Sequence, residues 1–341
     1  MPTLRTIRLR IKGTKNIKQI TRAMEAVSAV KMRKSQGVAL AARPYATAAL
    51  EVLKRMSASP RTDLGSEERS VLGEHRKVEN TMLVVITSDK GLAGPFNANV
   101  LKKAEQFIKE RVITPSSSLE TPSVPTSSRD TSLIREDRRG EITVAAVGKK
   151  AAEYFTRRGR KPVAAWTGFG DYAELAEVEP LFDAVTKAFT EKAADEVHIV
   201  YANFLSAMKQ EVVVRKLLPF DEKGLEEMVR GIVPVRGRFT EHDTNATNAR
   251  ANDTNKEYLF EPSPKEIFEA ILPALLKIQI YHAILEANAS EHSSRMIAMR
   301  NATDNASELI KGYTVSLNKA RQAAINKELA EITGGSEALA N

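Results

Sequence analysis

The sequence predicts an α/β fold in which a long antiparallel coiled coil of the N- and C-terminal helices joins a central Rossmann-like α/β domain. Two observations predict it: apolar residues recur at helical spacing near both chain ends, and strand-like and helix-like segments alternate between them. We expect an N-terminal coiled-coil helix at 1–58, the α/β domain at 80–218 with a disordered insertion at about 112–140, a polar connecting segment at 219–262, and a C-terminal coiled-coil helix at 263–333.

The N-terminal helix is predicted from a proline-free stretch, residues 3–43. Apolar residues recur there at helical spacing with a drifting phase, and the pattern continues to a helix end near Ser57. We expect the apolar stripe of Ile20, Met24 and Val27 to face the returning C-terminal helix.

This helix is strongly basic. Residues 1–56 hold thirteen Lys and Arg against two acids, whereas the whole chain of 341 residues has a net charge of +8. A nucleic-acid partner fits poorly because residues 1–44 contain no aromatic. A membrane surface also fits poorly, because the apolar face is built from Ile, Met, Val and Ala. A solvated coiled-coil face would explain the apolar spacing but not the sign bias, which predicts an acidic partner.

The middle of the chain alternates between strands and helices, which predicts a mostly parallel sheet. The predicted strands are 81–89, 141–148, 161–166, 195–204 and 211–220, and the predicted helices are 97–110, 149–159 and 174–193. Two polar stretches, 114–132 and 237–256, are too poor in apolar residues to pack, so we expect exposed loops there.

The C-terminal helix has the strongest pattern. Steps of three and four residues from Phe268 to Ala324 meet apolar residues everywhere except at His282, His292 and Thr303. This regular spacing predicts a coiled-coil seam. The seam includes Leu275, Ile278, Leu285, Met296, Met299, Ile310 and Leu317.

The topology predicts an antiparallel pair, because the first helix enters and the last leaves the same globular body. Both termini should therefore lie far from that body. The last helix is the longer one, so its tip should project beyond its partner. No uninterrupted apolar run approaches the roughly 18 residues that span a bilayer, so any membrane association should be indirect.

One turn, "SDKGLAGPFN" at 88–97, resembles a phosphate cradle but lacks the spacing of the known glycine motifs. A tight turn that uses Gly91 and Gly94 for backbone freedom is the favoured interpretation. The five histidines lack metal-ligand spacing, and the chain has no cysteine. We therefore expect no catalytic residue, metal or cofactor, with a phosphate- or nucleotide-binding α/β protein with coiled-coil arms as the alternative.

Several motifs together resemble the gamma subunit of the F-type, proton-translocating ATP synthase. They are "TRAMEAVSAVKMRKSQ", "RPY" at 43–45, "TSDKGLAGPFN", "EYLFEPSP", "ASEHSSRMIAMRNATDNASELI" and "NKARQAAINKELAEI". They lie in family order along nearly the whole chain, apart from the two polar insertions.

The resemblance implies a central rotor shaft that couples proton flow to ATP synthesis or hydrolysis. The coiled coil would lie inside a hexamer of alternating alpha and beta subunits, with the α/β domain joined to the epsilon subunit and the membrane c-ring. One copy would serve each complex, without nucleic acid and without its own bond chemistry. The complex would lie on the cytoplasmic face of a bacterial inner membrane.

The resemblance also implies contacts with the hexamer. They are Met24, Lys31, Arg33, Lys34, Arg321, Gln322, Asn326 and Glu328. Asn326 departs from the family, which usually has Thr there, and Gly334-Gly335 stands where the family has Gly-Ala. The loop at 237–256 lies where chloroplast relatives carry a dithiol switch, which a chain without cysteine cannot form.

Overall fold

The computed structural model describes residues 3–41, 48, 78–113, 141–170, 174–219 and 264–340. Its elements are α1 (Leu4–Ala41), β1 (Asn80–Ile86), α3 (Phe96–Ile113), β2 (Glu141–Val147), α4 (Lys149–Arg157), β3 (Ala164–Trp166), α5 (Leu175–Thr190), β4 (Glu196–Phe204), β5 (Gln210–Leu218) and α8 (Pro264–Ala340). Every strand and helix predicted between 80 and 218 is present. The helix end near Ser57 and the polar stretches 114–132 and 237–256 lie outside the described residues.

The sheet has five strands in the order β3-β2-β1-β4-β5. The first four are parallel, and β5 pairs antiparallel with β4 at one edge. β1 lies at the centre, and its apolar, β-branched run is buried on both faces, as parallel strands covered by helices require. The prediction of a mostly parallel sheet is confirmed.

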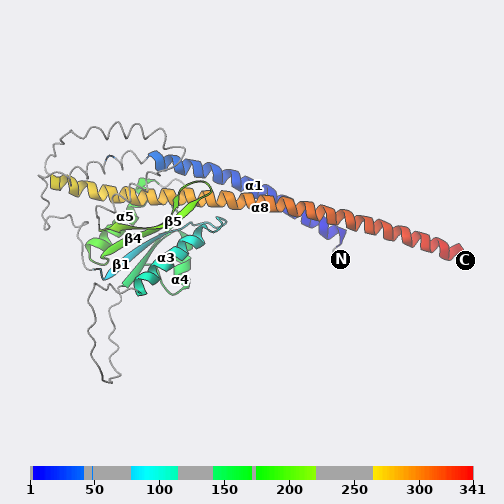
Figure 1. The fold of residues 1–341 in the computed structure, drawn as a ribbon, viewed down its shortest axis with the longest axis horizontal. Helices are drawn as coiled ribbons and strands as arrows, with labels where there is room; N and C mark the ends of the chain where they lie inside the picture. Colours follow the sequence, from blue (N-terminus) through cyan, green and yellow to red (C-terminus); the bar gives the residue numbers. More distant parts are fainter. Residues whose placement is uncertain are drawn as a thin grey trace, which may run out of the picture.

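Helices cover both faces of the sheet, so the body has three layers (Figure 1). α3 and α4 cover one face, where Phe96, Val100 and Phe155 pack on Leu83 and Val85. α5 and the first part of α8 cover the other, where their apolar residues join one core cluster with β1, β2, β4 and β5. The first part of α8 is therefore a core helix of the body.

α8 has 77 residues, which corresponds to roughly 115 Å at 1.5 Å per residue. It leaves the body as a projecting rod, with α1 antiparallel beside it and both termini far from the sheet (Figure 1). The C-terminal tip extends beyond the start of α1, as expected.

Part of α8, within Ala270–Thr333, is long and apolar enough by composition to cross a membrane, contrary to the sequence-based expectation. The difference arises because average hydropathy tolerates interspersed polar residues. In that stretch 61% of the residues are buried inside the protein, as in a core helix.

The face that α1 turns to α8 differs from the predicted stripe. Ile20 and Val27 are 60% and 54% exposed. The buried positions are instead Ile7, Thr21, Ser28, Met32 and Ser35, and half-buried residues between them complete a three- and four-residue spacing. The prediction for Ile20 and Val27 was wrong because the hydroxyl residues Thr21, Ser28 and Ser35, together with Ile7 and Met32, form the buried side of α1.

Hydroxyl groups are satisfied within this contact. The Thr21 and Thr303 hydroxyls lie 2.7 Å apart across the two helices, and Ser28 donates to the Met24 carbonyl of its own helix at 2.7 Å. Thr303 likewise donates to the Met299 carbonyl at 2.9 Å. Small hydroxyl residues can therefore be buried here without leaving an unpaired polar group.

Candidate functional site

The turn after β1 lies at the carboxyl edge of the sheet, where α/β folds usually bind nucleotides. In this chain the turn caps α4 instead. Gly148, which precedes α4, supplies no side-chain cap. Each of the first three α4 amides donates to one of three consecutive turn residues: Lys149 to the Asp89 carboxylate (2.7 Å), Lys150 to the Ser88 carbonyl (3.2 Å) and Ala151 to the Thr87 hydroxyl (2.8 Å).

Further bonds fix the turn. The second Asp89 oxygen accepts the Gly168 amide at 2.8 Å, and the Asn97 side-chain oxygen Oδ1 accepts the Ser88 amide at 3.0 Å. A phosphate at this edge would bind helix N-terminal amides, and here the chain's own groups occupy those of α4.

The glycines of the turn differ in role. Gly94 has a φ of +54°, in the left-handed region, which agrees with the predicted need for backbone freedom. Gly91 has no such φ, and a Cβ there would meet nothing within 4 Å. The prediction for Gly91 was therefore wrong. Its backbone carbonyl instead accepts a hydrogen bond from Arg295 of α8.

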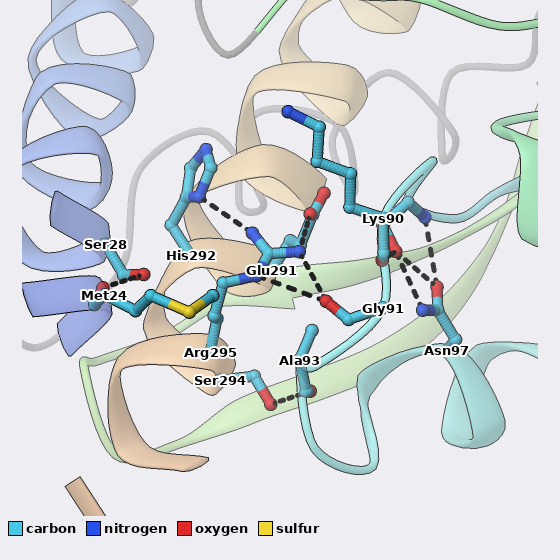
Figure 2. A network of polar contacts seen from close by, with 11 residues as sticks. Met24, Ser28, Lys90, Gly91, Ala93, Asn97, Glu291, His292, Ser294 and Arg295 are labelled. Atoms are coloured by element: carbon cyan, nitrogen blue, oxygen red, sulfur yellow. Dashed lines mark hydrogen bonds and ion pairs between the residues drawn. The ribbon is translucent and has the colours of Figure 1, made fainter. Parts of the chain in front are cut away.

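Residues 288–295 of α8, here called the docking segment, bind β4 and the loops at the carboxyl edge through side-chain donors, and Figure 2 shows the bonds of Ser294 and Arg295. Each acceptor is a backbone carbonyl: Gly170 for Asn288 (3.1 Å), Ala202 for Ser290 (2.9 Å), Ala207 for Ser293, Ala93 for Ser294 (2.7 Å), and Gly91 for Arg295 (3.2 Å from Nη2). The helix thus lies where a ligand of such a sheet would lie. It anchors the rod to the body.

A groove of about 610 Å³ runs between this edge and α1. Its walls come from four elements: α1, the turn after β1, the loop after β3, and the docking segment. Met24 and Val27 line it beside Leu92 and Phe169, and Lys31 and Lys90 add positive charge. Arg295, also in the lining, is held by Glu291 and lies 3.3 Å from the His292 Nδ1. Asp89 and Glu291 line the groove as well, so it offers apolar surface with charges of both signs.

The predicted partner-binding residues fall into two groups. Met24 and Lys31 line the groove, and Arg33 and Lys34 are exposed one turn further along α1. The other four, Arg321, Gln322, Asn326 and Glu328, are all exposed near the far end of α8. Nothing brings the two groups together, because they lie at opposite ends of the rod.

The predicted seam residues lie on the less exposed side of α8. Leu275, Leu285 and Met299 are buried, whereas Ile278, Met296, Ile310 and Leu317 are half-buried. The α8 residues that join the core cluster of the sheet are instead Leu272, Leu276, Ile280, Ala283, Ile284 and Ala287, so Leu275 and Leu285 are buried outside that cluster.

Sequence reasoning did not identify Lys90, Leu92 or the docking segment as a site. The motif "TSDKGLAGPFN" was the available signal, but it suggested only a turn or a phosphate cradle. That α8 covers this turn depends on contacts between residues about two hundred positions apart, which local patterns do not carry.

A second charged cluster lies at the opposite edge of the sheet. Glu196 bridges Arg111 at 2.8 Å, the His198 Nε2 at 3.0 Å and Lys216 at 3.5 Å. Burial raises the pKa of the Glu196 carboxyl, but the hydrogen bond from His198 and the charge of Arg111 outweigh it and lower the pKa to about 2. This cluster ties the end of α3 to β4 and β5.

The comparisons with known proteins agree with this geometry. A family described as ATP synthase matches residues 3–339. The ATP synthase gamma chain of Roseiflexus castenholzii is 37% identical over 342 residues, with 100% of this chain and 99% of that one covered. The corresponding chains of Chloroflexus aurantiacus and Chlorobaculum tepidum are 36% and 34% identical, and each comparison covers 99% of this chain and 99% of the relative.

Solved structures share the fold. The rotor of the Euglena gracilis mitochondrial ATP synthase in rotational state 1 has a TM-score of 0.53, covering 94% of this chain and 98% of the other. A chain of the OSCP/F1/c-ring assembly of the same enzyme in rotational state 3 has a TM-score of 0.58, covering 98% and 94%. Both are 18% identical, so they speak for the fold alone. The full-length match to relatives at 34–37% identity shows that this chain belongs to the family of ATP synthase gamma chains.

Proposed function

We propose that this chain is the central rotor shaft of an F-type ATP synthase and couples proton flow through a membrane ring to ATP synthesis or hydrolysis. One observation carries the proposal: α8 is a single helix that belongs to the core of the body and then continues as the projecting rod beside α1. Torque applied to the body therefore passes to the rod along one continuous backbone, without a hinge between separate elements.

The partners follow from the two ends of the molecule. The rod, as a coiled coil of α1 and α8, would lie inside a hexamer of alpha and beta subunits, one copy per complex. The α/β body, residues 80–218, would join the epsilon subunit and the c-ring. The complex would sit on the cytoplasmic face of a bacterial inner membrane, and this chain would contribute no catalytic site.

Two surfaces of the rod would contact the hexamer. The groove presents Met24, Lys31 and Lys90, with Arg33 and Lys34 nearby, and these lysines and this arginine suit acidic lever segments of beta. Exposed ion pairs are individually weak, about 0–1 kcal/mol each, so such contacts can exchange during rotation. The exposed Arg321, Gln322, Asn326 and Glu328 near the tip of α8 would contact beta loops.

The alternative of a nucleotide-binding α/β protein gains no support from this geometry. The first three α4 amides bind Thr87, Ser88 and Asp89, and the docking segment lies over the carboxyl edge of the sheet. A nucleotide would have to displace both.

Co-purification tests the proposal. A tagged chain, isolated from membranes washed at moderate salt, should bring down the alpha/beta hexamer and the c-ring in a fixed ratio. Recovery of the chain without either partner would contradict the rotor function. Micromolar binding of nucleotide to the isolated chain would instead favour the alternative.

A further inference from the structure

The Asp89 carboxylate connects two loops that belong to different strands. One oxygen accepts the Lys149 amide at 2.7 Å and the other accepts the Gly168 amide at 2.8 Å. Asp89 itself belongs to the turn after β1, Lys149 begins α4 after β2, and Gly168 follows β3. A single side chain therefore joins the ends of three neighbouring parallel strands.

These loops form one wall of the groove. Asp89, Lys90 and Leu92 line it from the turn, and the segment from Gly168 to Gly170 lines it from the β3 loop. The opposite wall, α1, is a rigid helix, but the loop wall consists of backbone without regular structure. Such a wall needs its own fixed points to present Lys90 and Phe169 in one arrangement.

Other fixed points of the loops come from α3, where the Asn97 side chain accepts the Ser88 amide, and from α8. Asn288 holds the Gly170 carbonyl, and Arg295 holds the Gly91 carbonyl. Each binds only one loop to the helix. Asp89 binds the two loops to each other and does so with a charged acceptor, which makes stronger bonds to amides than a neutral one.

We propose that Asp89 is a positioning residue: it holds the turn after β1 and the loop after β3 in the arrangement that makes the groove a preformed partner-binding wall. The inference rests on the proposed rotor function, because it assigns Asp89 a role in coupling through that groove. Asn in its place keeps one acceptor oxygen but replaces the other with a donor, so it can hold only one of the two amides. Ala can hold neither.

The test uses the assembled complex, with Asp89→Asn and Asp89→Ala, and Asp183→Asn as a control because Asp183 is an exposed carboxylate on α5. Hydrogen–deuterium exchange of peptides containing Lys149 and Gly168 reports the bridge directly. In Asp89→Ala both amides should lose protection by about tenfold or more, because each loses a charge-assisted bond. In Asp89→Asn the loss should be smaller, and Asp183→Asn should match the wild type.

Coupling is the second readout, measured as protons pumped per ATP hydrolysed in membrane vesicles. It should fall severalfold in Asp89→Ala and less in Asp89→Asn, while the subunit composition of the complex stays unchanged. Unchanged exchange at either amide would overturn the bridge. Increased exchange with normal coupling would overturn the positioning role.

A third variant separates this inference from the proposed function. Charge reversal of Lys31 and Lys34 tests the acidic partner itself. If Asp89→Ala uncouples the complex and that reversal does not, the positioning role stands and the acidic partner is wrong. Failure of the tagged chain to recover the hexamer would remove the rotor function while leaving the exchange result valid.

Discussion

Gly148 is a position where the backbone requires glycine. Its φ is +93°, and an added Cβ would clash with the Thr87 carbonyl oxygen, part of the turn that caps α4. We expect Gly148→Ala to lower the free energy of unfolding by about 3 kcal/mol or more, from strain and displaced backbone together. Urea denaturation of the full chain measures this. Gly159→Ala is the control, since its φ of +76° brings strain without any contact within 4 Å, so it should cost only about 1–2 kcal/mol.

The contacts proposed for Lys31 and Lys34 depend on charge. We expect Lys31→Glu with Lys34→Glu to lower protons pumped per ATP by about two- to fivefold, because two attractive contacts of up to about 1 kcal/mol become repulsive. The melting temperature is measured alongside, because Lys31 and Lys34 also interact within the chain. Lys102→Glu with Lys109→Glu, two exposed residues of α3, makes the same charge change away from the rod. Equal pumping by both double variants would argue against a charge-specific role of the rod.

Glu196 makes stability depend on pH. Its pKa is about 2 in the folded chain against an ordinary 4.5, so its ionised form stabilises the fold above about pH 4.5. That contribution is lost as the pH falls from 4.5 towards 2. At pH 7, Glu196→Gln should lower the unfolding free energy by about 1–2 kcal/mol after solvent screening. The gap to wild type should narrow at pH 3. Glu191 forms an exposed ion pair with Lys187, so Glu191→Gln should have nearly the same unfolding free energy as the wild type at both pH values.

At the scale of elements, local patterns predicted which segments form strands and helices but not how faces are shared. β1 is readable from its sequence because a buried central strand must be apolar on both sides. The buried side of α1 was misassigned because, by spacing alone, Ile20 and Val27 are as good candidates for it as the residues that are buried. The close contact between Thr21 and Thr303 decides which side of α1 faces α8. Partner choice between helices is not a local property.

The docking segment was not predictable for a different reason. Its side chains bind backbone carbonyls, which every residue carries, so no complementary sequence feature exists at the acceptor positions. Ser290 and Ser294 lie off the predicted seam, so the helical pattern assigned them no role. What the sequence does indicate is that small hydroxyl residues gather in this part of the helix, as a close approach to backbone requires.

Ser290 tests the docking segment. Its side chain is fully buried and donates to the Ala202 carbonyl of β4 at 2.9 Å. Ser290→Ala should lower the unfolding free energy by about 1–2 kcal/mol, because the carbonyl loses a bond that water cannot replace. Ser316→Ala is the matched control, since Ser316 is exposed and donates only within α8. It should change stability by less than about 0.5 kcal/mol. Equal effects of the two changes would mean that this bond does not anchor α8.

At the scale of the whole molecule, charge and packing vary along the rod. α8 is buried where it crosses the sheet, is buried on one side where α1 accompanies it, and is exposed throughout residues 321–333. The basic residues of α1 are spread along the helix from Arg5 to Lys34. We therefore expect the buried part of α8 to stabilise the fold and its exposed tip to contact a partner.

Removal of residues 321–341 separates the two properties. Because residues 321–333 are all exposed in the part of the chain that the structure describes, the truncated chain should unfold within about 1 kcal/mol of the full one. Assembled into the complex, it should pump fewer protons per ATP, since the contacts proposed for Arg321, Gln322, Asn326 and Glu328 are gone.

Ala306→Asp provides the opposite case. Ala306 is buried where α1 and α8 run together, so an unpaired carboxylate there should lower the free energy of unfolding by about 3 kcal/mol. Denaturation of both variants, paired with pumping in vesicles, distinguishes them. A truncation that destabilises the chain as much as Ala306→Asp would mean that the tip supports the fold rather than a partner.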